Sequence, residues 1–237
     1  MLKEAMEHIE SLAKVAKFEY GGRNYTSREL SSVRPPRAGV IKVNTLTGLV
    51  DYILKYGSEG AFVWVTDHQS VNYLSVLHSD WQDRDKFVTA TTDLYDCAFP
   101  FDSWIDQESF NIKLQSQFVK TEARDKLLQF AGTIRNESIE ISEDDGVTQR
   151  GQTSAGVHLA NKVDIPNPVN LQPFRTFPEI EQPESQFVFR VKNGEKSYDK
   201  GIKCALFEAD GGAWKKSSIL LIKEYLAKKL PDVTIVA

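Results

Sequence analysis

The chain has 237 residues, of which 41% are hydrophobic and 26% are charged. This length and composition are typical of a folded protein with its own core and exclude a disordered chain. A net charge of −4 does not favour nucleic acid as a partner. No apolar window of about 18 residues predicts a membrane span, and no secretion signal is recognisable, so we expect a cytoplasmic protein.

The residues that usually carry chemistry are sparse and scattered. Cys97 and Cys204 are far apart, which predicts reduced thiols rather than a disulfide. The four histidines show none of the regular spacings of a metal site, and no serine or cysteine belongs to a nucleophile motif. We therefore predict no metal, no cofactor and no catalytic residue, and we expect a non-enzymatic protein.

The first 37 residues are predicted to form a separate unit. Apolar residues recur at helical spacing over 2–16, which predicts an amphipathic helix with an apolar stripe that needs a partner. A hairpin is predicted over 17–27 around the Gly21-Gly22 turn, and 34–37 reads as an extended linker. The remaining residues, 38–237, are predicted to form one α+β domain.

In the main domain, 41–65 predicts a strand, a helix and a strand, with Thr45 or Thr47 as the helix cap and Gly57 at its end. Strands over 71–78 and 86–93 follow, so an antiparallel arrangement is favoured there.

Further helices are expected over 103–111 and 122–132 and a hairpin pair over 138–166. Strands over 186–192 and 202–209, an amphipathic helix over 214–230 and a short last strand complete the prediction. The expected fold class is α+β, with mixed, mostly antiparallel sheets and an amphipathic helix near each end.

Residues 166–190 hold five of the nine prolines and end in an alternating strand pattern. Because proline fixes its own φ and pushes the preceding residue toward extended geometry, this proline-rich arm should follow an ordered, extended path. Its composition suits an interface with an apolar centre and a charged rim. We predict that the arm lies against a neighbouring subunit through these residues: Pro173, Phe174, Phe177, Pro178, Glu179, Glu181 and Pro183.

Three arginines, Arg150, Arg175 and Arg190, flank or occupy the arm and are candidates to bind a phosphate or nucleotide. Arg175 lies between Phe174 and Phe177, a combination that also suits a stacked base. The alternative is that Arg175 pairs with a glutamate of the arm, Glu179 or Glu181, and locks the arm against its own fold or a neighbouring subunit.

Two acidic groups admit a chemical and a structural interpretation. Glu143, Asp144 and Asp145 precede a glycine and predict an acidic hairpin turn rather than a cation site, because the alternating carboxylates of a calcium loop are absent. Glu208 and Asp210 stand two residues apart and could do acid and base work. The competing interpretation has Asp210 capping the final helix while the nearby Trp214 packs into the core.

Several segments together resemble a phage and prophage family, the YfdQ-like proteins. The resemblance rests on DDGVTQ at 144–149, the arm at 166–190 and ALFEADGGAWK at 205–215, with LTGLVDYI at 46–53 and FPFDSWI at 99–105 in the same layout. It covers nearly the whole chain. It implies a gene of a bacteriophage or cryptic prophage and a bacterial host cytoplasm, and it implies no reaction.

Three functional hypotheses follow. The leading one is a non-enzymatic phage accessory protein that self-assembles into a homo-oligomer through the arm. The second is a protein that binds a nucleotide or small anion and acts against a host defence. The third is a nucleic-acid-binding factor of phage recombination or replication, which the net charge disfavours.

Overall fold

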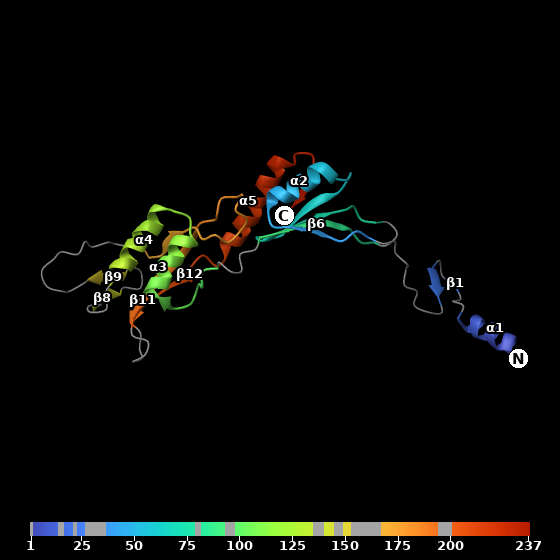
Figure 1. Cartoon of the computed structure of the whole chain (residues 1–237), viewed down its shortest axis with the longest axis horizontal. Coiled ribbons are helices and arrows are strands. Elements are labelled where there is room, and N and C mark those ends of the chain that lie inside the picture. Colours follow the sequence, from blue (N-terminus) through green and yellow to red (C-terminus); the bar gives the residue numbers. More distant parts are fainter. Residues whose placement is uncertain are drawn as a thin grey trace. The chain divides into compact units, whose positions relative to one another are not determined.

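The computed structural model describes residues 2–13, 17–20, 23–26, 37–78, 82–92, 98–134, 140–144, 149–152, 167–193 and 201–237. The chain divides into two compact units, Met1–Ala38 and Gly39–Ala237. Its helices and antiparallel and mixed sheets confirm the predicted α+β class (Figure 1). None of the described helices combines the length and the apolar character that crossing a membrane requires.

The first unit contains the predicted helix and hairpin. Helix α1 spans Leu2–Ala13, and the antiparallel strands β1 (Lys17–Tyr20) and β2 (Arg23–Thr26) follow it. The linker residues 34–36 lie outside the described part of the chain.

The first sheet of the main unit has five strands in the order β13-β4-β5-β6-β3. Its central strands β4 (Phe62–Asp67), β5 (Ser70–Leu74) and β6 (Lys86–Thr91) form the expected antiparallel meander. The two outer strands, β3 (Ile41–Val43) and β13 (Thr234–Val236), instead run parallel to their neighbours. Parallel strands are joined by a long crossover connection, so their pairing cannot be predicted from strands that are neighbours in the sequence.

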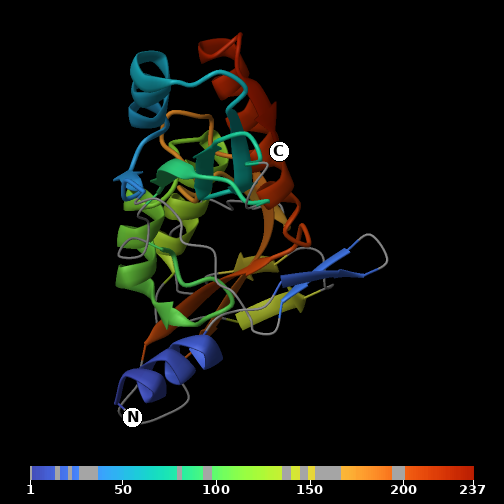
Figure 2. The same ribbon diagram turned by 90° about the vertical axis from the view of Figure 1, so that its right-hand side faces the viewer.

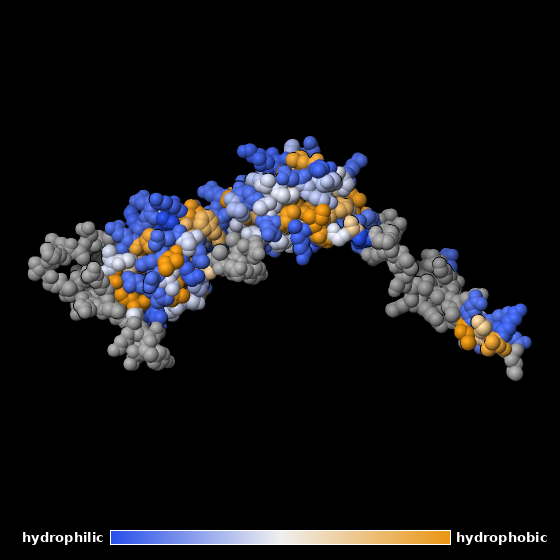
Figure 3. Space-filling model, in the orientation of Figure 1, coloured by the Kyte–Doolittle hydropathy of each residue, from blue (hydrophilic) through white to orange (hydrophobic). Residues whose placement is uncertain are grey.

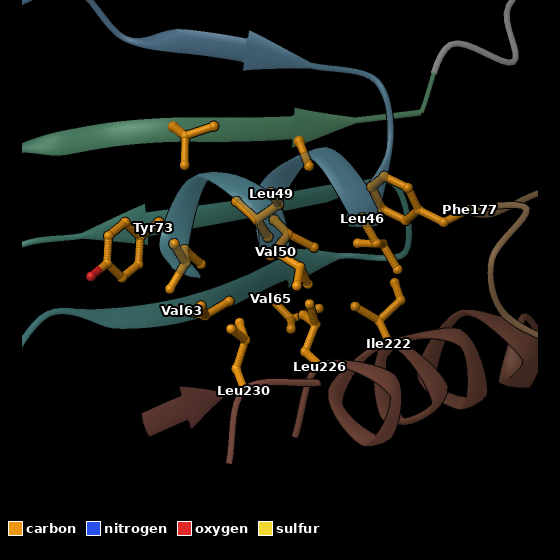
Figure 4. Packing of buried hydrophobic residues seen from close by; sticks show 14 of the residues in the cluster. Leu46, Leu49, Val50, Val63, Val65, Tyr73, Phe177, Ile222, Leu226 and Leu230 are labelled. Atoms are coloured by element: carbon orange, nitrogen blue, oxygen red, sulfur yellow. The ribbon is translucent and has the colours of Figure 1, made fainter. Parts of the chain in front are cut away.

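Two helices cover one face of this sheet, as Figures 1 and 2 show. Helix α2 (Leu46–Tyr56) begins at Thr45, whose Oγ1 accepts a hydrogen bond from the backbone N–H of Gly48 at 3.0 Å, and it ends at Gly57. Helix α5 (Ala213–Lys229) buries residues mostly four positions apart, among them Ile222 and Leu226. Side chains of both helices and the sheet form an aliphatic cluster (Figure 4).

The second sheet has four antiparallel strands in the order β10-β11-β12-β7. The strands are β10 (Val169–Leu171), β11 (Ser185–Asn193), β12 (Ile202–Glu208) and β7 (Ile105–Asp106). Helices α3 (Gln107–Ser116) and α4 (Glu122–Thr133) supply buried residues to one face of this sheet. The resulting core is rich in phenylalanine.

Helix α3 begins four residues later than predicted. Asp106 caps it by accepting a hydrogen bond from the N–H of Ser109 at 2.8 Å, and the two residues before the helix pair with β12 as strand β7. Two strands of the predicted hairpin pair are described, the antiparallel β8 (Glu140–Asp144) and β9 (Gln149–Gln152), whereas the prediction over 153–166 lies outside the described residues. Asp145 and the glycine that follows it lie outside the described residues.

Candidate ligand-binding cavity

The proline-rich arm packs against both sheets of its own unit. The arm contains strand β10 of the second sheet. Just after β10 it pairs with the residues that follow α3: Pro173 forms a β-bridge with Phe118, and the N–H of Phe174 donates to the carbonyl of Gln117 at 2.9 Å. Four residues later, the ring of Phe177 lies fully buried in the aliphatic cluster (Figure 4). The arm is therefore an intramolecular connection between the aromatic and aliphatic cores.

A buried glutamine holds the turn of the arm. The Gln182 side chain accepts hydrogen bonds from the backbone N–H groups of Arg175 and Thr176, at 2.9 and 3.3 Å. Its amide nitrogen donates to the carbonyls of Phe177 and Ile180, at 3.0 and 3.3 Å. All the hydrogen-bonding capacity that an amide commonly uses is thereby satisfied inside the fold. Gln182 was not predicted as a site residue, because a single glutamine in a loop carries no pattern.

Arg175 is buried at the inner edge of the arm. Its guanidinium carbon lies 3.8 Å from the ring centroid of Trp214 and 5.4 and 5.6 Å from those of Phe101 and Phe187. The two terminal nitrogens bind the carboxylate of Glu208 and the hydroxyl of Ser185. Burial lowers the pKa of Arg175 to about 10, against the opposing effect of the Glu208 carboxylate, so the side chain stays charged at neutral pH.

The partner of Arg175 is thus neither glutamate of the arm. Glu179 instead accepts a hydrogen bond from the N–H of Thr47, at 3.1 Å, in the first turn of α2, and Glu181 is exposed. A carboxylate near a helix N-terminus is favourable because it accepts from backbone groups that have no partner within the helix. The arginine pairs with the end of β12, which is 33 residues away in the sequence.

Trp214 closes the site from the start of α5. Its ring meets the ring of His68 edge to face at a centroid distance of 4.7 Å, and the tryptophan is buried as predicted. The prediction that Asp210 caps α5 is wrong. The cap is Gly212, at φ +78°, and Asp210 accepts the N–H of that glycine at 2.9 Å. This turn inserts two positive-φ glycines between the aspartate and the helix, which places its carboxylate too early in the chain to reach the first helical N–H groups.

A cavity of about 270 Å³ lies next to Arg175. It is lined mainly by apolar and aromatic residues, together with two glutamines and the Arg175–Glu208 pair. The lining residues are Gln69, Ala98, Phe99, Phe101, Gln117, Pro173, Phe174, Arg175, Glu208 and Trp214. Concave, mostly apolar sites with a few polar groups are where proteins commonly bind small molecules.

Three residues of the lining have buried polar atoms that find no hydrogen-bond partner within the described residues. They are the Nε of Arg175, the Nε1 of Trp214 and the Oε1 of Gln117. Leaving such an atom unpaired costs about 1 to 3 kcal/mol. Two donors and one acceptor on residues around one cavity are thus without a partner in the described part of the chain, and because each is covered by neighbouring atoms, a polar molecule in the cavity would reach them after a shift of the lining side chains.

Arg190, another predicted phosphate ligand, does not join this site. Arg175 contacts the face of β11 on which Ser185 lies. Arg190 is an odd number of residues from Ser185 along β11, so its side chain lies on the other face. Arg150 lies on β9, paired with Glu143. Among the arginine side chains that the structure describes, Arg175 is the predicted phosphate ligand that lines the cavity, and the side chain of Arg150 lies outside the described part.

The predicted interface residues fall into two groups. Pro173, Phe177 and Pro183 are buried in the protein's own fold, whereas Pro178 and Glu181 are exposed and Glu179 is half-buried. Phe174 is 45% exposed and lines the cavity. The apolar half of the predicted interface is therefore largely occupied by the chain itself.

The other acidic and cysteine side chains singled out from the sequence take part in the protein's own fold. Glu208 is engaged by Arg175, and Asp210 lies in a turn outside the strand, so the two do not form a pair on one strand face. Burial raises the pKa of the Cys204 thiol to about 12, which keeps it protonated. Among the described residues, no three histidine, cysteine or acidic side chains gather to hold a metal ion, and Cys97 lies outside them.

Comparison with protein-family models, with curated proteins and with solved structures gives no match for this chain.

Proposed function

We propose that the main unit is a non-catalytic binding module that takes a small, planar, polar molecule into the cavity beside Arg175. The observation that carries the proposal is the coincidence of a 270 Å³ cavity with three unpartnered polar atoms on its lining residues, as far as the structure describes the chain. Each of the three belongs to a different element: the arm, α5 and the end of α3. A ligand that pairs with them would hold these elements together.

The charge of the lining favours a neutral ring over a free phosphate. Among the described residues of the lining, Arg175 and Glu208 are the only charged ones and they bind each other, so their charges cancel. A phosphate would have to compete with this carboxylate for the guanidinium. A neutral ligand with two hydrogen-bond acceptors and one donor avoids that competition, since it would pair with the atoms that the ion pair leaves unused.

Size and stacking favour a ring of nucleobase dimensions. An apolar cavity of about 150 Å³ is enough for benzene, so about 270 Å³ accommodates one or two fused rings. Phe174 is the exposed aromatic of the lining and can stack on such a ring, which contributes about 1 to 3 kcal/mol in other base-binding proteins. The proposed ligand class is a nucleobase or nucleoside.

The test is a thermal melting screen with purine and pyrimidine bases, nucleosides, nucleotides and inorganic phosphate. A ligand at about 100 times its dissociation constant should stabilise the protein by about 2.7 kcal/mol. We expect a base or nucleoside to raise the melting temperature and phosphate alone to leave it unchanged. A shift with phosphate but not with bases would contradict the ligand class, and no shift across the panel would contradict the function.

Two variants locate the binding site. Phe174→Ala removes the exposed ring and should weaken binding by roughly 5- to 150-fold, the equivalent of 1 to 3 kcal/mol. Leu54→Ala is the matched control, because Leu54 is a 69% exposed apolar residue of α2 that does not line the cavity. Equal affinities of the two variants, measured by calorimetry, would place the ligand elsewhere.

The other functions expected from the sequence stay proposals. Self-assembly through the arm would have to use its surface residues, mainly Phe174, Pro178 and Glu181, because the remaining apolar residues of the predicted interface are buried. An origin in a phage or prophage rests on the resemblance to the YfdQ-like proteins alone. Nucleic acid binding has no further support beyond that origin, and the net charge of −4 weighs against it.

A further inference from the structure

We propose that α1 pairs with α1 of a second copy of this chain in an antiparallel, two-fold symmetric arrangement. This proposal is independent of the cavity. It starts from three large apolar side chains of α1 that are strongly exposed: Leu2 at 79%, Met6 at 63% and Ile9 at 66%. In Figure 3, hydrophobic colour gathers along one side of this helix and hydrophilic colour covers another.

The spacing of these residues is that of a helix-pairing seam. Steps of four and three residues from Leu2 to Met6 to Ile9 follow the alternation of the two core positions of a heptad. Isolated helices of about 12 residues are marginal in water, so packing of the apolar face has to provide much of the stability of α1. A helix with this seam is expected to be ordered by a partner.

The charges beside the seam select both the partner and its direction. At 100° per residue, Lys3 and Glu10 lie on the same flank of the stripe, and the small Ala5 lies on the other flank. In an antiparallel pair like flanks meet, so Lys3 of each copy faces Glu10 of the other and forms two symmetric ion pairs. In a parallel pair unlike flanks meet, and both charges would face the flank of Ala5 instead.

The apolar contribution is tested by the native mass of the full chain, measured by sedimentation over a concentration series. We expect a dimer that Ile9→Lys weakens at least about a hundredfold, because two apolar side chains leave the seam. Ser11→Lys is the matched control, since it adds the same charge on the far side of the helix and should leave the dimer unchanged. A monomer throughout, or equal effects of the two variants, would overturn the proposal.

The direction is tested by exchanging charges. Lys3→Glu and Glu10→Lys each turn both ion pairs into repulsions and should each weaken the dimer roughly tenfold. The first variant carries glutamate at both flank positions and the second carries lysine at both. An equimolar mixture should therefore regain the affinity of the original chain, because each facing pair in the mixed dimer joins opposite charges. Failure of the mixture to associate better than either variant alone would exclude the antiparallel pair.

A third outcome identifies a competing occupant of the stripe. If α1 packs onto its own chain, the protein stays monomeric and Ile9→Lys lowers its melting temperature while Ser11→Lys does not. That result would overturn pairing between copies.

Discussion

The two cores of the main unit are built from different side chains. The cluster between α2, α5 and the five-stranded sheet consists largely of leucine, isoleucine and valine. The cluster under α3 and α4 is dominated by phenylalanine, with ring pairs such as Phe101 stacked on Phe187 at a centroid distance of 5.1 Å. Most aliphatic residues come from regular helices and strands, whereas two of the rings, Phe99 and Phe101, come from the loop before β7. Because a single ring here contacts several others, the aromatic core depends more on individual side chains.

The largest expected effect is on the aromatic core. Phe187→Ala removes a fully buried ring that contacts both Phe101 and Phe118, and it should lower the free energy of unfolding by about 3 to 5 kcal/mol. Leu49→Ala, also fully buried, is the matched change in the aliphatic core and should cost about 2 to 5 kcal/mol.

Urea unfolding followed by circular dichroism measures both variants. If the two cores unfold as one cooperative unit, each variant shifts a single transition. Two transitions, of which each variant moves only one, would show that the cores are separate folding units. A loss well below about 3 kcal/mol for Phe187→Ala would contradict the dependence of the aromatic core on single rings.

The second prediction concerns the ion pair between Arg175 of the arm and Glu208 of β12. Glu208→Gln leaves the Arg175 charge buried without its carboxylate and should cost about 2 kcal/mol, less than the roughly 3 to 5 kcal/mol of a fully buried pair because the Glu208 side chain is 29% exposed. Arg175→Met keeps an apolar chain against the three rings and should cost less than about 1 kcal/mol. The same unfolding experiment ranks the two variants, and the reverse order would mean that the charge itself, rather than its burial, stabilises the site.

Local signals predicted most of the elements that build these cores. Helical spacing identified α1, α2, α4 and α5, and alternation identified β4, β11 and β12, because both patterns are set by neighbours in sequence. The two outer strands were predicted, but their parallel pairing was not, since β3 pairs with β6 across more than 40 intervening residues. The pairing of strands so far apart in the sequence depends on how the helices between them pack on the sheet.

The site was predicted only in part for the same reason. Arg175 and Phe174 were singled out from their local sequence, and both line the cavity. Its remaining polar residues, including Gln117 and Glu208, come from other elements and meet the arm only after folding. No local pattern could have joined a glutamine at the end of α3 to a tryptophan at the start of α5.

The third prediction is confined to the aliphatic side and separates the two expected caps of α2. Thr45→Ala removes the acceptor of the Gly48 N–H and should cost about 1 kcal/mol. Thr47→Ala should cost less, because the Thr47 backbone makes the contact with Glu179 and the Thr47 hydroxyl makes only a long hydrogen bond, at 3.4 Å, with the hydroxyl of Tyr225. Thermal unfolding of the two variants checks this ranking. Equal losses would mean that the cap contributes nothing beyond the loss of a threonine.

The smallest expected effect is on the pH dependence of stability, through His68 beside Trp214. Burial lowers the pKa of His68 below its usual 6.5, while the neighbouring Asp67 opposes the shift and Lys215 and Arg175 add to it. The unfolded chain therefore binds a proton at a higher pH than the folded protein does. Stability should be lost as the pH falls through about 6.5 toward the lowered pKa. His68→Gln, compared with the original protein in melting experiments at pH 7.5 and at pH 5.5, should lose less stability on acidification. An unchanged dependence would assign the loss to other groups, and a greater loss in the variant would show that the protonated ring is stabilised where it lies.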